Sequence, residues 1–146
     1  MTAPGSLFLV PNLLGAVPPG NVLPVRTIEV ARAVGHWVVE TPKAARAFLK
    51  SIAPDRPIAE LAIAEIGEHP DAGRLRTLLA PARAGEDIGV LSDAGCPGVA
   101  DPGAALVAAA HGEGLRVAPL VGPSSLLLAV MEKRAGLARA IALDPE

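Results

Sequence analysis

The residues best suited to chemistry gather in one stretch, Ser92–Gly103, which reads SDAGCPGVADPG. Its glycines permit positive φ angles or the close approach of a ligand, and its two prolines stiffen the path of the chain. Asp93 either forms an Asx turn or holds the ammonium or hydroxyl group of a ligand. We interpret Asp101, which precedes a proline, as a helix cap and not as a catalytic group. The stretch therefore predicts a tight turn between a strand and a helix.

Other side chains with chemical potential are few. Cys96 is the only cysteine, so the chain can form neither an internal disulfide nor a cysteine-rich zinc site. Because no histidine follows it in a partner pattern, we interpret its thiol as core-facing or ligand-facing and not as a nucleophile. Glu40, at the end of a predicted strand, is either a general base or a solvated charge. The three histidines are widely spaced and indicate no metal site (His36, His69 and His111).

Strands and helices alternate around Ser92–Gly103. Short apolar runs predict strands at Leu7–Val10, Trp37–Glu40, within Ile58–Ile66, and at Ile88–Leu91 and Leu115–Leu120. Apolar spacing and proline or glycine signals predict helices at Pro24–Val34, from Thr41 and Pro42 to Ile52, around Leu75–Ala82 with an end near Gly85, at Ala104–His111 and at Leu126–Met131. This alternation predicts an α/β fold with an open, mainly parallel sheet of about five strands and helices on both faces.

Three loops rich in glycine or proline follow predicted strands, at Pro11–Gly20, Ser92–Gly103 and Val121–Ser125. Because the carboxyl ends of parallel strands share one edge of the sheet, we expect these loops to meet there. Their backbone N–H groups suit a polar or anionic small molecule, whereas the alternative is that the glycines and prolines serve only to turn the chain. Neither G-x-G-x-x-G nor G-x-x-x-x-G-K-[ST] occurs, which disfavours dinucleotide and nucleoside triphosphate sites.

Composition sets further bounds. At 146 residues with 51% hydrophobic and 19% charged residues, the chain has the size and character of one packed domain. Its net charge of −2 provides no basic footprint for nucleic acid, and its 2% aromatic content predicts no base-stacking platform. No apolar run approaches the roughly 18 residues of a membrane span, and the start lacks a signal-peptide pattern. We expect a cytoplasmic protein without membrane contact.

Beyond these patterns, the segment Leu91–Gly103 resembles the S-D-A-G-[TC]-P-x-[IV]-[SA]-D-P-G signature of the tetrapyrrole methylase superfamily. The likeness is nearest to the ribosomal RNA small-subunit 2′-O-methyltransferase I branch. Val117–Ser125 resembles that branch's next strand and its G-P-[CS]-[AS] turn, and Leu7–Pro11 matches its opening strand. The likeness covers roughly residues 5 to 131, and the central loop makes it specific.

The resemblance implies a methyltransferase that uses S-adenosylmethionine, held in a cleft between two α/β domains. Carried over by motif, the cofactor-binding residues would lie in the central loop and in the two neighbouring loops: Pro11, Asp93, Ala94, Gly95, Cys96, Val99, Ala100, Gly122, Pro123, Ser124 and Ser125. Glu40 is the predicted catalytic residue, and no metal is implied. Methyl transfer from a sulfonium requires mainly positioning for in-line attack, with deprotonation of the acceptor where that is a hydroxyl.

The sequence departs from the family pattern in two places. Val39–Lys43 keeps Glu40 and Thr41 of the branch's A-E-D-T-R stretch without its aspartate and arginine, and the first loop does not read P-T-P-I-G-N-L. The acceptor therefore stays open, with a ribosomal RNA 2′-hydroxyl as one candidate and RNA contact expected through a second domain. We expect residues 1–131 to form the cofactor-binding domain and 132–146 a tail or the start of that second domain.

Two readings of function remain. The first is a methyltransferase with weak or no turnover by this chain alone. The alternative is an inactive α/β module, derived from such an enzyme, that binds or oligomerises. We expect an exposed apolar face that favours a homodimer.

Overall fold

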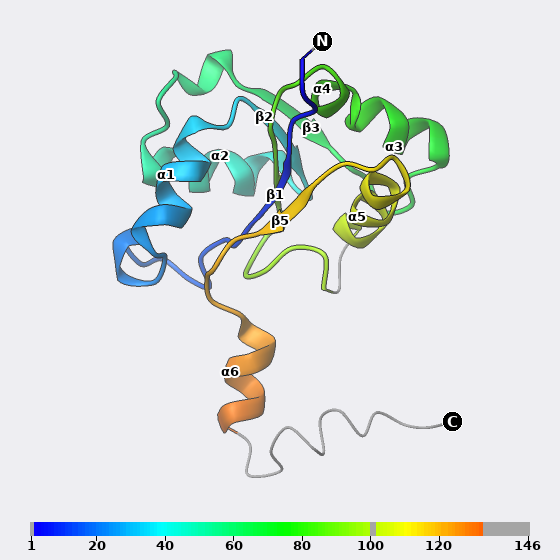
Figure 1. Cartoon of the computed structure of the whole chain (residues 1–146). Helices are drawn as coiled ribbons and strands as arrows, with labels where there is room; N and C mark the ends of the chain where they lie inside the picture. Colours follow the sequence, from blue (N-terminus) through cyan, green and yellow to red (C-terminus); the bar gives the residue numbers. More distant parts are fainter. Residues whose placement is uncertain (1, 100–101, 133–146) are drawn as a thin grey trace, which may run out of the picture.

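The computed structural model describes residues 2–99 and 102–132, which form a sheet flanked by helices (Figure 1). The strands are β1 (Leu7–Val10), β2 (His36–Val39), β3 (Ala62–Glu65), β4 (Ile88–Leu91) and β5 (Val117–Pro119). They lie in the order β3-β2-β4-β1-β5, and every pairing between them is parallel. The predicted α/β fold with an open sheet of about five strands is confirmed.

Helices cover both faces of this sheet. On one face lie α1 (Val25–Ala33) and α2 (Pro42–Ile52), and on the other α3 (Ala72–Leu78), α4 (Ala80–Arg83) and α5 (Gly103–Gly112). Two single turns of 3₁₀ helix occupy Pro19–Asn21 and Ile58–Glu60. The last helix, α6 (Ser125–Glu132), projects away from the sheet and its flanking helices (Figure 1).

Alternation along the strands divides the core between the two faces. In β2, Trp37 and Val39 pack with the helices α1 and α2, whereas Val38 packs with α3, α4 and α5. The Trp37 indole N–H donates a hydrogen bond to the Val34 carbonyl at 3.2 Å, and its ring meets Phe48 edge-on. Burial of each such side chain stabilises the fold by about 1.5–3 kcal/mol. The sheet is thus packed against helices on both faces, and its carboxyl edge positions the loops.

Two predicted strands are shorter in the structure. The strand expected within Ile58–Ile66 begins only at Ala62, because the three residues after Pro57 close a 3₁₀ turn. The last strand is limited to Val117–Pro119, since the Leu115 N–H still bonds the Ala110 carbonyl at the end of α5.

The helix expected to end near Gly85 is divided into α3 and α4. Pro81 lacks the N–H that a continuous helix needs at that position, so the hydrogen-bond ladder breaks there. Helix α5 begins at Gly103, one residue before the predicted start at Ala104, and Pro102 occupies its cap position. The expected cap Asp101 lies outside the described residues.

Candidate functional site

The three glycine- and proline-rich loops meet at the carboxyl edge of the sheet, as predicted. The Asn12 N–H donates to the Gly95 carbonyl at 2.9 Å, which joins the first loop to the central loop in an isolated antiparallel bridge. The Cys96 thiol donates to the Pro123 carbonyl at 3.4 Å, which joins the central loop to the third loop. The parallel sheet thus brings the first and central loops together although their residues lie about 80 positions apart in the chain.

An open cleft of about 660 Å³ lies between the central loop and the start of α6. This volume is within the range of about 300–1,000 Å³ that is usual for small-molecule sites. Seven of the residues predicted from the sequence line it, together with Ser92, Leu126 and Ala129: Glu40, Asp93, Ala94, Cys96, Val99, Ser124 and Ser125. The cleft therefore gathers most of the predicted site on one surface.

Glu40 and Thr41 fix Asp93 from the neighbouring strand end. The Glu40 Oε1 atom accepts a hydrogen bond from the Asp93 backbone N–H at 3.0 Å, and the Thr41 hydroxyl donates to Asp93 Oδ2 at 2.8 Å. Thr41 followed by Pro42 is a sequence pattern typical of a helix cap, and Thr41 does occupy the cap position of α2. Its side chain makes no capping hydrogen bond, however, and reaches across to the Asp93 carboxylate instead. Asp93 is thus held through both its backbone and its side chain.

Asn12 is a positioning residue that the sequence analysis missed. Its side chain is only 6% exposed, and its Nδ2 atom donates to the carbonyls of Ser92 and Asp93 at 3.0 and 3.3 Å. Its Oδ1 atom accepts from the Leu13 N–H at 2.7 Å. The available signal was a polar residue two positions after a strand and before two leucines. Buried polar side chains are nearly always hydrogen-bonded, and here the partners are backbone groups.

Four predicted site residues are not among those that line the cleft: Pro11, Gly95, Gly122 and Pro123. Pro11 is fully buried, and a β-carbon added at Gly122 would collide with its ring. Gly95 has a φ of +67°, a conformation that other residues adopt only with strain. These residues shape the loops that form the cleft, and Ala100 lies outside the described residues.

Thr27 of α1 holds the third loop through a hydrogen bond. Its side chain is 2% exposed, and its hydroxyl donates to the Val121 carbonyl at 2.7 Å. The sequence offered no signal for this contact, because Thr27 lies in the middle of a predicted helix and Val121 lies 94 residues later.

A second cleft of about 530 Å³ opens between the first loop and α2. Its walls are mostly apolar, and its lining includes Leu13, Leu14, Val17, Ala47 and Phe48. Asp93 and Ala94 line both clefts, so the two meet at the central loop. A ligand in the first cleft and another in the second would therefore approach each other at Asp93.

Within residues 2–99 and 102–132, no group of three or more histidine, cysteine, aspartate or glutamate residues is placed to hold a metal ion. No helix in the same residues is long and apolar enough to span a bilayer.

Comparison with known proteins agrees with the motif. No protein-family model matches the chain. It is 36% identical over 130 residues to a ribosomal RNA small subunit methyltransferase I of Xylella fastidiosa, a match that covers 89% of this chain and 45% of that protein. Proteins of the same name from Micromonospora olivasterospora and Escherichia coli O157:H7 are 35% and 31% identical over 87% and 86% of this chain. The chain belongs to the tetrapyrrole methylase superfamily.

This tetrapyrrole methylase chain spans less than half the length of these three relatives, of which the matches cover 45%, 38% and 41%. The superfamily signature falls on the central loop, the element that both clefts share. The sequence feature that marks the superfamily is therefore also the geometric centre of the candidate site.

Proposed function

We propose that the chain is the cofactor-binding part of an S-adenosylmethionine-dependent methyltransferase, with a ribosomal RNA 2′-hydroxyl as acceptor. The observation that carries this proposal is the 660 Å³ cleft built around the superfamily loop at the carboxyl edge of a parallel sheet. Ligands of open α/β sheets bind at this edge. The name shared by the relatives supports the reaction class and ribosomal RNA as the substrate, and the 2′-hydroxyl follows from the resemblance of the central loop to its family signature.

The residues of the cleft fit the cofactor's chemistry. The Asp93 carboxylate is held in place by Thr41 and offers hydrogen-bond acceptors to an ammonium group or to ribose hydroxyls. Val99, Leu126 and Ala129 supply apolar surface for an adenine ring. When bound, the cofactor supplies an activated methyl group, so the chain's own task is mainly to position it for in-line attack.

Glu40 lies at the same cleft and is the residue best placed to accept the proton of an acceptor hydroxyl. Its Oε1 atom also receives the Asp93 N–H, so this carboxylate couples proton acceptance to the position of the central loop. The role of Glu40 is part of the proposal.

Calorimetric titration of the chain with S-adenosylhomocysteine tests the cofactor assignment. We expect binding that Asp93→Ala weakens by about tenfold or more, because a charge-assisted hydrogen bond contributes about 1.5–3 kcal/mol. Asp55→Ala is the matched control, since Asp55 is an exposed carboxylate beyond the other end of α2. Equal affinity of the chain and the Asp93→Ala variant, or no binding by the chain, would contradict the assignment and favour the inactive module.

We further propose that a second copy of the chain packs on α6 to form a homodimer. None of the residues of α6 is buried, although the helix carries four large apolar side chains, at Leu126, Leu127, Leu128 and Met131, that are each more than half exposed. Several large apolar side chains exposed on one short helix favour such an interface.

A further inference from the structure

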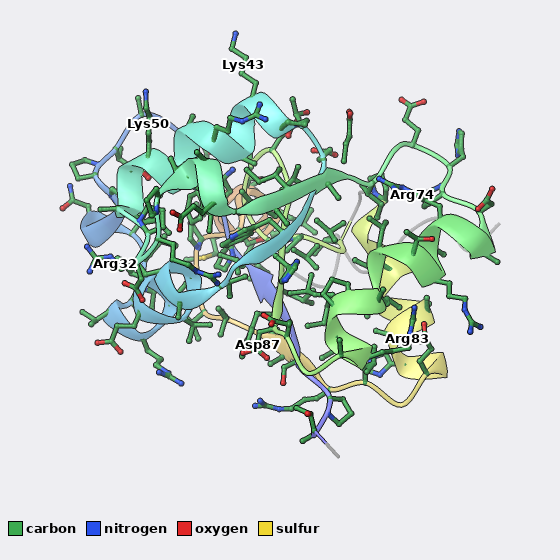
Figure 2. The ribbon with its side chains drawn as sticks, turned by 90° about the horizontal axis from the view of Figure 1, so that it is seen from above. Arg32, Lys43, Lys50, Arg74, Arg83 and Asp87 are labelled. Carbon is green, nitrogen blue, oxygen red and sulfur yellow. The ribbon has the colours of Figure 1, made fainter. Side chains whose placement is uncertain are left out.

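Helix α2 presents a row of basic side chains to solvent. Lys43, Arg46 and Lys50, which we name the α2 ridge, are all exposed, and their spacing of three and four residues places them on one stripe of the helix. Figure 2 shows Lys43 and Lys50 projecting from α2 away from the sheet. The stripe extends about 10 Å from its first to its last residue, at a rise of about 1.5 Å per residue.

Acidic side chains do not neutralise this ridge. Helix α2 contains no aspartate or glutamate, and among residues 2–99 and 102–132 no ion pair involves any of the three cations. By contrast, Arg83 is paired with Glu113 at 2.7 Å on the other face of the sheet. The net charge of −2 therefore conceals a local positive patch. Such a patch attracts anions through a field that salt screens over about 8–10 Å.

The ridge borders the second cleft. Ala44, Ala47, Phe48 and Ser51 line that cleft from the adjoining face of the same helix. The cleft in turn reaches Asp93 and Ala94 of the central loop. If a polyanion lay along the ridge, the monomer beyond the ridge would lie beside the second cleft. That cleft is mostly apolar and leads to the candidate site.

We propose that the α2 ridge binds the phosphate backbone of a single-stranded RNA segment and that the second cleft admits one of its nucleotides. Three cations in a row match successive phosphates of a strand, and apolar walls match the faces of a base. The proposal rests on the proposed function, because in-line transfer requires the acceptor oxygen to approach the methyl carbon opposite the sulfur that leaves. The second cleft offers such an approach, since it meets the first at Asp93 and Ala94. The ridge proposal assigns RNA contact to this chain. The net charge of −2 had predicted that the chain has no basic surface for nucleic acid.

The test measures binding of a fluorescein-labelled oligouridine of about 12 nucleotides, a length within single-strand site sizes. The triple variant Lys43→Gln, Arg46→Gln, Lys50→Gln removes the ridge. The matched control removes the same charge at three exposed and scattered arginines: Arg26→Gln, Arg76→Gln and Arg116→Gln. Fluorescence anisotropy is recorded over a range of salt concentrations, and S-adenosylhomocysteine affinity is measured by calorimetry for each variant.

We expect the ridge variant to bind RNA about tenfold to a hundredfold more weakly near physiological salt. The slope of log K against log salt should fall by about 2 in magnitude, because each lost phosphate contact contributes about 0.7 for single strands. The control should lose much less affinity, and S-adenosylhomocysteine binding should be unchanged in both variants.

Equal losses of RNA affinity in the ridge and control variants, or no RNA binding by the unmodified chain, would overturn the ridge proposal. Either result leaves the cofactor assignment standing if S-adenosylhomocysteine still binds. Failure of S-adenosylhomocysteine to bind, with RNA binding still dependent on the ridge, would instead overturn the methyltransferase proposal and retain the RNA surface.

Discussion

The Thr41 hydroxyl donates a hydrogen bond to the Asp93 carboxylate at 2.8 Å, which links the start of α2 to the loop after β4. The two residues lie 52 positions apart and meet because β2 and β4 are neighbours in the sheet. Since Glu40 also receives the Asp93 N–H, one strand end holds this aspartate by two contacts. The residues between β2 and α2 therefore orient Asp93 as much as its own loop does.

Replacement of Thr41 by valine tests this coupling. Thr41→Val keeps the shape of the side chain and removes the hydroxyl, so the Asp93 carboxylate loses its partner. We expect about fivefold weaker binding of S-adenosylhomocysteine, which corresponds to about 1 kcal/mol for one partly exposed hydrogen bond. Thr41→Ser retains the hydroxyl and should bind nearly as well as the unmodified chain. Full affinity in Thr41→Val would show that Asp93 does not depend on this contact.

Removal of the Asn12 side chain should destabilise the whole fold. Asn12→Ala leaves the carbonyls of Ser92 and Asp93 without their shared donor, and the Ser92 bond is buried. We expect a loss of about 2–3 kcal/mol in the free energy of unfolding, measured by urea denaturation. Asn21→Ala is the control, because Asn21 is exposed and its change should stay within about 0.5 kcal/mol. A loss as small as in the control would mean that the loops hold their positions without Asn12.

Addition of a methyl group at Gly122 should also destabilise the chain, for a steric reason. The new β-carbon of Gly122→Ala would meet the buried ring of Pro11, so the third loop must shift. We expect a cost of about 1–3 kcal/mol in thermal or urea unfolding. Gly112→Ala is the comparison, since no atom lies within 4 Å of a β-carbon there and alanine favours the helix. Equal stability of both variants would contradict the close packing of the first and third loops.

Charges placed on α6 should prevent self-association. Leu127 and Met131 are four residues apart on one side of the helix and are 57% and 79% exposed. The double variant Leu127→Glu, Met131→Glu should sediment as a monomer where the unmodified chain sediments as a dimer, with unchanged circular dichroism. A monomeric unmodified chain would contradict the dimer proposal. So would a variant that remains dimeric.

The local pattern of the sequence determined the fold class and the identity of the central loop. Short apolar runs between glycines and prolines are sufficient to mark buried parallel strands, and the carboxyl ends of those strands must share an edge. For this reason the meeting of three loops and most of the cleft lining were predictable. The limits of elements were less predictable, as at Ile58–Ile66, because a proline or a turn can end an apolar run early.

Only the tertiary structure decided which side chains hold the site in place. Thr41 has the sequence context of a helix cap, yet a carboxylate from a neighbouring loop takes its hydroxyl. Asn12 satisfies carbonyls about 80 residues away, and local pattern carries no information about such partners. The spacing of the three cations in the sequence places them on one stripe of α2. That this stripe lies beside the second cleft follows only from how α2 packs on the sheet. Periodicity reports which face of an element is buried, whereas hydrogen-bond partners and charge placement depend on the strand order β3-β2-β4-β1-β5.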